Sequence, residues 1–311
     1  MSHKIFVDGQ DGTTGLRIHE YLSARTDVEV LRIDPDKRKD ASERRRLLNE
    51  ADVAFLCLPD AAAKESVAMI ENPKTCVIDA SSAHRINPDW AYGVPELSSD
   101  YRDRVRTHKR IANPGCHATA FVVPMKPLVD AKIIDRAATI CTYSITGYTG
   151  GGKRRIEQYE RKDDPKLSSP RPYAMDLHHK HLPEMRVHSG LRHAPVFSPI
   201  IGDFARGLAC TTLLPISQMG ITAQELHSCL TEHYAREQYV RVMPLNGADN
   251  LDRDHFDVQG SNDTNFVDVF VFATDECALL IGRLDNLGKG ASGAAIQCMN
   301  IHLGYPEDRG L

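Results

Sequence analysis

Short apolar strands alternate with helical segments through the N-terminal quarter of the chain, and this alternation constrains the fold more than any other feature. Apolar runs predict strands at residues 4–7 and 28–33, within 51–58, and at 76–79. Apolar residues at helical spacing follow the first strand at 16–22, and residues 64–70 after the third strand are also expected to be helical. Strands that are apolar almost throughout are typical of a sheet covered on both faces. The sequence therefore predicts an α/β fold that begins with a parallel sheet.

A glycine-rich turn with the sequence GQDGTTG joins the first strand to the first helix at residues 9–15. Glycines here let the backbone approach a pyrophosphate at the helix N-terminus, which attracts the negative charge. The spacing is GxxGxxG rather than GxGxxG, so the position in the first turn supports the assignment more than the motif does. We expect a Rossmann-like dinucleotide-binding domain. The cofactor contacts expected from this turn are Gly9, Gly12, Thr13, Thr14 and Gly15.

The residues after the second strand leave the choice of dinucleotide open. Asp34 comes directly after this strand, at the distance from Gly15 where a carboxylate can accept a hydrogen bond from the ribose 2′-hydroxyl of NAD. Lys37 and Arg38 follow closely and can instead receive the 2′-phosphate of NADP. All three are therefore candidate cofactor residues.

The pattern changes after residue 115. Residues 138–144 and 208–214 predict strands, and residues 266–273 and 277–284 alternate in period 2, which indicates an antiparallel hairpin. Thr222 and Glu225 form a capping box at the start of a helix. We expect an α+β catalytic and oligomerisation domain over 116–289 with a largely antiparallel sheet, and a cofactor domain over 1–115. A terminal helix ends at Gly304, and residues 153–175 start a helix and continue as a polar excursion.

Cys116 is the candidate nucleophile. It follows Asn113-Pro114-Gly115, and the apolar spacing after it predicts a helix whose first turn contains the thiol. The unsatisfied N–H groups and the positive dipole end of a helix start favour a thiolate. The same groups can hold an oxyanion or a phosphate oxygen.

The stretch His178-His179-Lys180-His181-Leu182-Pro183-Glu184 holds the densest group of titratable side chains. Zinc ligation, exposed histidines without a chemical role, and acid–base chemistry are all open on the residues alone. In the acid–base reading one histidine is the proton-transfer partner of Cys116 and Glu184 orients it. We predict no metal, because three histidines within four residues cannot all point the same way.

Cationic and polar residues at strand–loop junctions favour an anionic substrate. Arg85 follows the fourth strand, Arg206 precedes a later one, and residues 144–153 combine hydroxyl groups with Lys153. The candidate substrate contacts are Arg85, Asn113, Ser144, Gly147, Lys153 and Arg206.

Seven motifs, in this order and across nearly the whole chain, give the sequence a family resemblance. They are VDGQDGTTG at 7–15, DASSAHR at 79–85, YGVPEL at 92–97, NPGC at 113–116, GYTGGGK at 147–153, HKHLPE at 179–184 and DNLGKGASG at 285–293. The sequence resembles N-acetyl-gamma-glutamyl-phosphate reductases, and specifically their shorter subtype. The resemblance implies NADPH-dependent reductive dephosphorylation of N-acetylglutamyl phosphate in arginine biosynthesis, by a cytoplasmic homo-oligomer (a dimer or a tetramer).

The resemblance also implies residue roles. Cys116 matches the nucleophile that forms a thioester, and His181 matches the acid–base residue. Residues 286–293 would lie near the nicotinamide, and the helix over 290–304 would pack back onto the cofactor domain. The cofactor contacts added on this basis are Ser81, Asn286 and Gly290. His117 also neighbours the thiol, but adjacent side chains on a helix point away from each other.

Two other functions fit parts of the sequence. Aspartate-semialdehyde dehydrogenase shares the thioester chemistry and the domain order, although the HKHLPE stretch argues against it. A non-enzymatic NADP-binding redox sensor would use Cys116 as an oxidisable switch.

Composition narrows the class of protein further. A net charge of −4 gives no indication of nucleic-acid binding. No apolar run approaches the length that spans a membrane and no signal-peptide pattern opens the chain, so we expect no membrane contact and a cytoplasmic location. The eight cysteines show no CxxC spacing, which favours reduced thiols over a disulfide framework.

Overall fold

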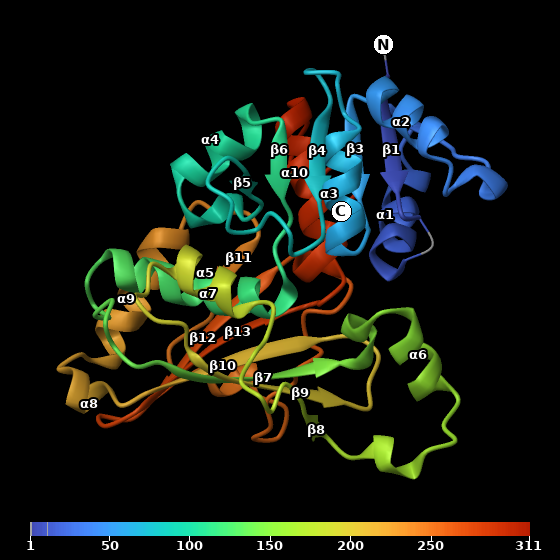
Figure 1. Ribbon diagram of the computed structural model, residues 1–311. Helices are drawn as coiled ribbons and strands as arrows, with labels where there is room; N and C mark the ends of the chain where they lie inside the picture. Colours follow the sequence, from blue (N-terminus) through green and yellow to red (C-terminus); the bar gives the residue numbers. More distant parts are fainter. Residues whose placement is uncertain (1, 11) are drawn as a thin grey trace. The chain divides into compact units, whose positions relative to one another are not determined.

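The computed structural model describes residues 2–10 and 12–311. Met1 and Asp11, the latter within the glycine-rich turn, lie outside the described residues. The chain divides into two compact units, one formed by Met1–Gly115 with Ala291–Leu311 and one by Cys116–Gly290 (Figure 1). We call them unit 1 and unit 2.

Unit 1 is built on a six-stranded sheet in which every described strand pair is parallel. Its strands, in the order in which they lie in the sheet, are β2 (Val28–Leu31), β1 (His3–Asp8), β3 (Val53–Leu56), β4 (Cys76–Asp79), β6 (Arg110–Ala112) and β5 (Ala91–Tyr92). Strands β3 and β4 are buried at every position. The predicted α/β fold with an N-terminal parallel sheet is confirmed.

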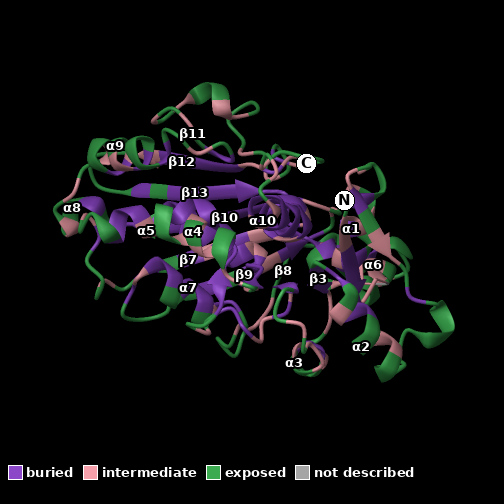
Figure 2. Cartoon of the chain, turned by 90° about the horizontal axis from the view of Figure 1, so that it is seen from above, coloured by how far each residue is buried: buried purple, intermediate pink, exposed green. Residues whose placement is uncertain are grey.

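In the described part of unit 1 there are five α-helices. They are α1 (Thr13–Ser23), α2 (Ala41–Glu50), α3 (Asp60–Ala68), α4 (Ser99–Thr107) and α10 (Gly293–Leu303). Helix α10 is buried along nearly its whole length (Figure 2) and packs into the same apolar cluster as Ile5, Val7 and Ile78. Gly304, with φ +75°, ends α10 in the left-handed conformation that the sequence predicted.

Unit 2 contains a seven-stranded mixed sheet. Its strands, in sheet order, are β11 (Val240–Val242), β12 (Val267–Ala273), β13 (Ala278–Leu284), β10 (Leu208–Leu214), β7 (Cys141–Gly147), β9 (Val196–Gly202) and β8 (Arg171–Pro172). The pairs β11–β12 and β7–β9 are parallel, and the other pairs are antiparallel. This confirms the largely antiparallel sheet and the hairpin between β12 and β13.

The described helices of unit 2 include the one that begins at the candidate nucleophile. They are α5 (Cys116–Asp130), α6 (Lys153–Glu160), α7 (Leu182–Ser189), α8 (Ile216–Met219) and α9 (Ala223–Tyr234). The predicted capping box at Thr222 and Glu225 is present at the start of α9. A π-helical turn, Gly288–Ser292, precedes α10.

Pro124 and Pro127 lie inside α5 and have no N–H group. The carbonyl oxygens of Ala120 and Val123, four residues earlier, therefore lack their helical donors. The Tyr234 hydroxyl of α9 donates to the Val123 carbonyl oxygen at 2.6 Å. Gly282 of β13 faces the Ala120 carbonyl, and a Cβ on this glycine would lie 2.0 Å from that oxygen. Helix α5 therefore rests directly on the backbone of β13. Within the described residues, no helix is long and apolar enough to cross a membrane.

Candidate active site

Cys116 is the first residue of α5, as the sequence predicted, and its side chain is half-buried. The N–H groups of the first helical turn have no acceptor within the helix, and they carry the positive end of its dipole. Gly290 lies against this residue, because a Cβ on the glycine would come within 2.8 Å of the Cys116 Cβ. A glycine at position 290 therefore leaves room for the nucleophile.

His117 lies at the centre of a cluster of rings and hydroxyl groups. Its Nδ1 lies 2.8 Å from the Ser144 hydroxyl of β7, and its Nε2 lies 3.0 Å from the Tyr173 hydroxyl. Burial, with smaller contributions from the charges of His179 and Lys180, lowers the pKa of His117 to about 3. At neutral pH this imidazole is uncharged and both of its nitrogens are engaged.

His181 and Glu184 belong to the first turn of α7. His181 is the N-cap residue and is buried, and Glu184 follows within that turn. The His181 backbone N–H donates to Nδ1 of His179 at 3.2 Å, so the neutral form of His179 carries its proton on Nε2. The His181 ring centroid lies 5.5 Å from that of His117, the residue next to Cys116. The structure thus brings His181 into the cluster beside the start of α5.

Metal binding was one alternative for the histidine stretch. Among residues 2–10 and 12–311, no group of three or more His, Cys, Asp or Glu side chains is arranged to hold a metal ion.

Tyr173 belongs to the cluster, but sequence reasoning did not find it. Burial raises the pKa of its phenol, and the negative charge of Cys116 raises it further, with Arg155 acting in the opposite direction. The hydroxyl therefore stays protonated and lies within electrostatic reach of the candidate nucleophile. Tyr173 lies in the polar excursion after β8, where no periodicity or motif marked it.

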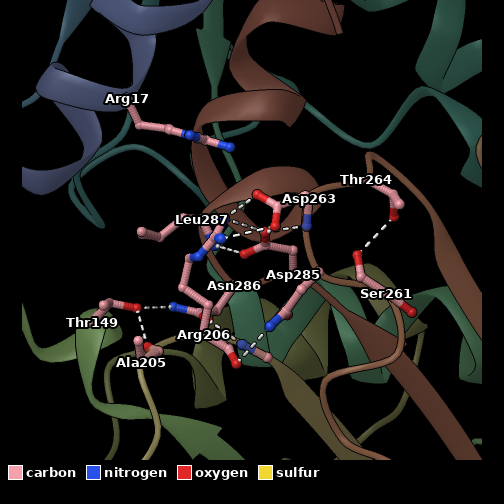
Figure 3. A network of polar contacts seen from close by, with 12 residues as sticks. Arg17, Thr149, Ala205, Arg206, Ser261, Asp263, Thr264, Asp285, Asn286 and Leu287 are labelled. Carbon is pink, nitrogen blue, oxygen red and sulfur yellow. Dashed lines mark hydrogen bonds and ion pairs between the residues drawn. The ribbon is translucent and has the colours of Figure 1, made fainter.

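Arg206 forms ion pairs with two carboxylates (Figure 3). It holds Asp263 with two nitrogens at 2.6 and 2.9 Å, and it reaches Asp285 at 3.2 Å. Asp285 also accepts hydrogen bonds from the backbone N–H groups of Asp263 and Leu287. The predicted contact between Arg206 and the substrate stays a prediction, and the structure shows that this guanidinium already has protein partners.

Asn286 ties three segments of unit 2 together through its amide group (Figure 3). Its Oδ1 accepts from the Gly207 N–H at 2.9 Å, and its Nδ2 donates to the Thr149 hydroxyl at 3.0 Å. Gly147 also packs tightly here, since a Cβ on it would lie 2.5 Å from the Ala205 carbonyl oxygen. Two residues assigned to ligand contacts thus have structural contacts as well. Lys153, exposed at the start of α6, lies at the end of the same loop.

In unit 1 the glycine-rich turn is built as a phosphate site requires. Gly9 has φ +91°, and a Cβ there would lie 2.3 Å from the Cys57 carbonyl oxygen. A Cβ on Gly15 would lie 2.5 Å from the Gly9 carbonyl oxygen. Gly12 is the N-cap of α1, and among the described residues no side chain caps this helix start. The N–H groups of Thr13 and Thr14 therefore fit a pyrophosphate, which is the group that a dinucleotide presents.

The residues that were expected to distinguish NAD from NADP lie in a short turn after β2. The Asp34 carboxylate accepts a hydrogen bond from the Asp36 N–H at 3.0 Å and caps the helical turn Pro35–Lys37. Lys37 and Arg38 are exposed beside it. Asp34 keeps its charge as a cap, and the two cationic side chains beside it can receive the 2′-phosphate of NADP.

The motif after β4 makes internal contacts in unit 1. The Ser81 N–H and hydroxyl both donate to Asp79, at 2.9 and 2.7 Å. Arg85 is buried and donates to the carbonyl oxygens of Asn113 and Ala80. Asn113 donates from Nδ2 to the Ala291 carbonyl oxygen at 2.9 Å. These contacts organise the carboxyl ends of β4 and β6, and the ligand roles of Ser81, Arg85 and Asn113 stay predictions.

Comparison with known families matches each part of the chain. A family described as semialdehyde dehydrogenase, NAD binding domain, matches residues 4–105. A second family, described as semialdehyde dehydrogenase, dimerisation domain, matches residues 116–286.

Curated relatives match nearly the whole chain. The N-acetyl-gamma-glutamyl-phosphate reductase of Burkholderia cenocepacia (strain HI2424) is 43% identical over 305 residues, which cover 96% of this chain and 97% of the relative. The chain belongs to the N-acetyl-gamma-glutamyl-phosphate reductase family. Another member, N-acetyl-gamma-glutamyl-phosphate reductase 2 of Nostoc sp., is 41% identical over 318 residues, with 99% of each chain covered.

Solved structures share the fold of this N-acetyl-gamma-glutamyl-phosphate reductase family member. An aspartate semialdehyde dehydrogenase II from Vibrio cholerae, complexed with ASA, superposes with a TM-score of 0.73 at 16% identity, covering 98% of this chain and 99% of that one. The aspartate semialdehyde dehydrogenase from Candida albicans with NADP gives a TM-score of 0.68, also at 16% identity, covering 97% of this chain and 98% of that one. At this identity the similarity establishes the two-domain architecture.

Proposed function

We propose that the chain reduces N-acetyl-L-glutamyl 5-phosphate to N-acetyl-L-glutamate 5-semialdehyde and phosphate, with NADPH as reductant, as a step of arginine biosynthesis. The observation that carries this proposal is the position of Cys116 at the start of α5, in a chain 43% identical to an N-acetyl-gamma-glutamyl-phosphate reductase. A thiol at a helix start is suited to attack an acyl phosphate, because the helix favours both the thiolate and the departing anion.

Cys116 acts as the nucleophile in this proposal. Its thiolate attacks the acyl carbon, the carbon–oxygen bond to phosphate breaks, and phosphate leaves with the electron pair while a thioester forms. Backbone N–H groups of the first turn of α5 stabilise the oxyanion during the attack. Release of the aldehyde breaks the carbon–sulfur bond and returns the thiolate.

NADPH supplies a hydride for the thioester carbon when it is bound. The residues that would hold it in unit 1 are Gly9, Gly12, Thr13, Thr14 and Gly15 at the pyrophosphate, Asp34, Lys37 and Arg38 at the adenosine ribose, and Ser81. Asn286 and Gly290 of unit 2 are assigned to the nicotinamide end.

His181 holds the proton of the reacting oxygen. It protonates the thiohemiacetal oxygen, or takes that proton back as the aldehyde is released. Glu184, in the same helical turn, is assigned to orient it. His117 is not assigned as the proton donor, because burial lowers its pKa to about 3 and its imidazole is uncharged at neutral pH.

The substrate is an anion at both ends, and cationic or polar residues are assigned to it. They are Arg85, Asn113, Ser144, Gly147 and Lys153, whereas Arg206, the sixth candidate from the sequence, is already paired with Asp263 and Asp285. Among these, Lys153 is exposed at a helix start, whereas Ser144 is fully buried and bound to His117. Lys153 is therefore the anion contact that we propose for unit 2.

We also propose that the protein is a cytoplasmic homo-oligomer and that unit 2 carries the subunit contact. A row of exposed side chains crosses the open face of its sheet in register: Val196 of β9, Cys141 of β7, Leu213 of β10 and Leu279 of β13. Three of the four are large aliphatic residues, which a monomer seldom leaves exposed side by side. A second copy is the occupant that the dimerisation-domain match favours.

The reverse reaction tests the function directly. Purified protein is mixed with N-acetyl-L-glutamate 5-semialdehyde, phosphate and NADP, and the absorbance of NADPH is followed. We expect reduction that requires phosphate, and a much lower rate with L-aspartate 4-semialdehyde. Preference for the aspartate compound would assign the chain to the other semialdehyde dehydrogenase activity. Binding of NADPH without phosphate-dependent turnover of either compound would support a sensor rather than an enzyme.

A further inference from the structure

Hydrogen bonds and an ion pair hold the 285–290 segment in place at Asp285, and Gly290 at its other end lies against the nucleophile. Asp285 is fully buried and accepts from Arg206, from the Asp263 N–H and from the Leu287 N–H (Figure 3). At the far end, Gly290 donates to the Asp285 carbonyl oxygen at 2.9 Å and packs on Cys116. Displacing Asp285 therefore moves the backbone that contacts the thiol-bearing residue.

Arg206 is the cation that pairs with Asp285. Its guanidinium bridges Asp285 in this segment and Asp263 in the neighbouring loop, and its own carbonyl oxygen accepts from the side chains of Gln259 and Asn262. Asp263 adopts φ +60°, so its position in the loop is held in a left-handed conformation. Arg206 thus joins the 204–207, 259–263 and 285–290 segments.

The charges around Arg206 argue against its use as a substrate clamp. One guanidinium faces the negative charge of two carboxylates, and the Asp285 side chain is fully buried. A substrate carboxylate or phosphate approaching it would meet that charge as well as the cation. The geometry points to a different role, and we propose that Arg206 is a positioning residue that holds the 285–290 segment against Cys116. This role rests on the proposed reaction.

Substitution of Asp263 distinguishes a positioning role of Arg206 from a substrate-binding role. The first role predicts a lower kcat, and the second predicts a lower KM. The side chain of Asp263 is 62% exposed, and Asn tolerates its φ of +60°, so Asp263→Asn should fold. If Arg206 positions the segment, both Asp263→Asn and Arg206→Gln lower kcat, the latter by about 10- to 100-fold, with little change in KM. If Arg206 binds substrate, Asp263→Asn releases the guanidinium and lowers KM, whereas Arg206→Gln raises it.

Alkylation of Cys116 gives a readout that does not depend on turnover. Each variant is treated with iodoacetamide, an uncharged reagent, and modification is followed peptide by peptide by mass spectrometry. We expect faster alkylation of Cys116 in both variants, because the segment packed on it is loosened. The exposed Cys277 serves as an internal control, and its rate should not change.

The double variant Arg206→Gln with Asp263→Asn should match the Arg206→Gln single variant, since both act through one contact. Unchanged alkylation of Cys116 together with a KM shift would overturn the positioning role. An inactive wild-type protein would instead defeat the proposed function, while the alkylation comparison would still decide whether Arg206 holds the segment.

Discussion

His117 Nδ1 lies 2.8 Å from the Ser144 hydroxyl, and this contact keeps His117, the residue next to the nucleophile, out of the acid–base chemistry of the site. We expect His117→Phe to lower kcat by less than about tenfold, and His181→Ala to lower it by about 10²–10⁴-fold. The pH profile of kcat should keep its inflection in the first variant and lose it in the second. Loss of the inflection in His117→Phe alone would move the proton-transfer role to His117.

Stability should depend on pH through His117. Its pKa is about 3 in the folded chain and about 6.5 in the unfolded chain, so below pH 6.5 only the unfolded state takes up the proton. Stability from this group is therefore complete above about pH 6.5 and is lost as the pH falls towards 3, amounting to about 2 kcal/mol at pH 5. Urea unfolding at pH 7.5 and pH 5 should show this loss in the wild type and a smaller one in His117→Phe. Equal losses would place the titration elsewhere.

Replacing the nucleophile should stop the reaction and spare cofactor binding. Cys116→Ser keeps the size of the side chain but offers a hydroxyl, which is a far weaker nucleophile than a thiolate near neutral pH. We expect no measurable turnover, and NADPH affinity by fluorescence titration close to that of the wild type. A rate near the wild-type value would rule out the thioester route.

Gly282 should be intolerant of any side chain. A Cβ at this position would lie 2.0 Å from the Ala120 carbonyl oxygen, and both groups belong to backbone that cannot rotate away. Gly282→Ala should therefore lower the free energy of unfolding by about 3 kcal/mol, at the upper end for overpacking. Gly150→Ala is the matched control: its nearest neighbour would be 3.7 Å away, and the change should stay within about 0.5 kcal/mol.

The subunit contact can be tested at Leu213, in the centre of the exposed row on the unit 2 sheet. Leu213→Glu places a charge on that face and should convert the oligomer to smaller species in light scattering after size exclusion. Lys132→Glu, on an exposed turn after α5, introduces the same charge elsewhere and should leave the mass unchanged. An unaltered mass for Leu213→Glu would remove the subunit contact from this face.

Strands with a continuous apolar pattern were predictable from the sequence, and those without one were not. Residues 208–214 and 76–79 were predicted with the bounds that the structure shows. Strand β9 was missed, because Pro199 interrupts its apolar run and a proline in a strand ordinarily marks an edge. It is tolerated one strand from the edge, where Arg171 and Pro172 of the short strand β8 pair with Ile201 and Ile200.

One helix of unit 1 was missed because its sequence is mostly polar. Helix α4 reads SDYRDRVRT and buries only Val105, so no apolar stripe was there to count. Helix α2 contains the basic cluster Arg44-Arg45-Arg46, and such a run of charges is typical of a solvated helix face. Arg45 and Arg46 do lie exposed, but Arg44 is paired with the buried Asp8 at 2.9 Å. A run of charges gives no sign of which member turns inward.

In the candidate site, local motifs located the residues, but only the three-dimensional structure supplied their partners. The start of α5 at Cys116 followed from spacing, whereas its neighbour Gly290 stands at the opposite end of the unit 2 sequence. Arg206 looked like a substrate contact because a cation at a strand start often is one. Its two carboxylates come from separate loops, and no periodicity links those loops to it.

Pro124 and Pro127 fix how α5 is rotated about its own axis. Each leaves one carbonyl without its helical donor, and each of those oxygens meets one external group, the Gly282 backbone or the Tyr234 hydroxyl. Turning the helix by one residue would take the Val123 oxygen away from the Tyr234 hydroxyl, and a buried carbonyl that loses its partner is costly in an apolar interior. The direction in which Cys116 points is thus fixed from the middle of its helix, by residues that never touch the reacting atoms.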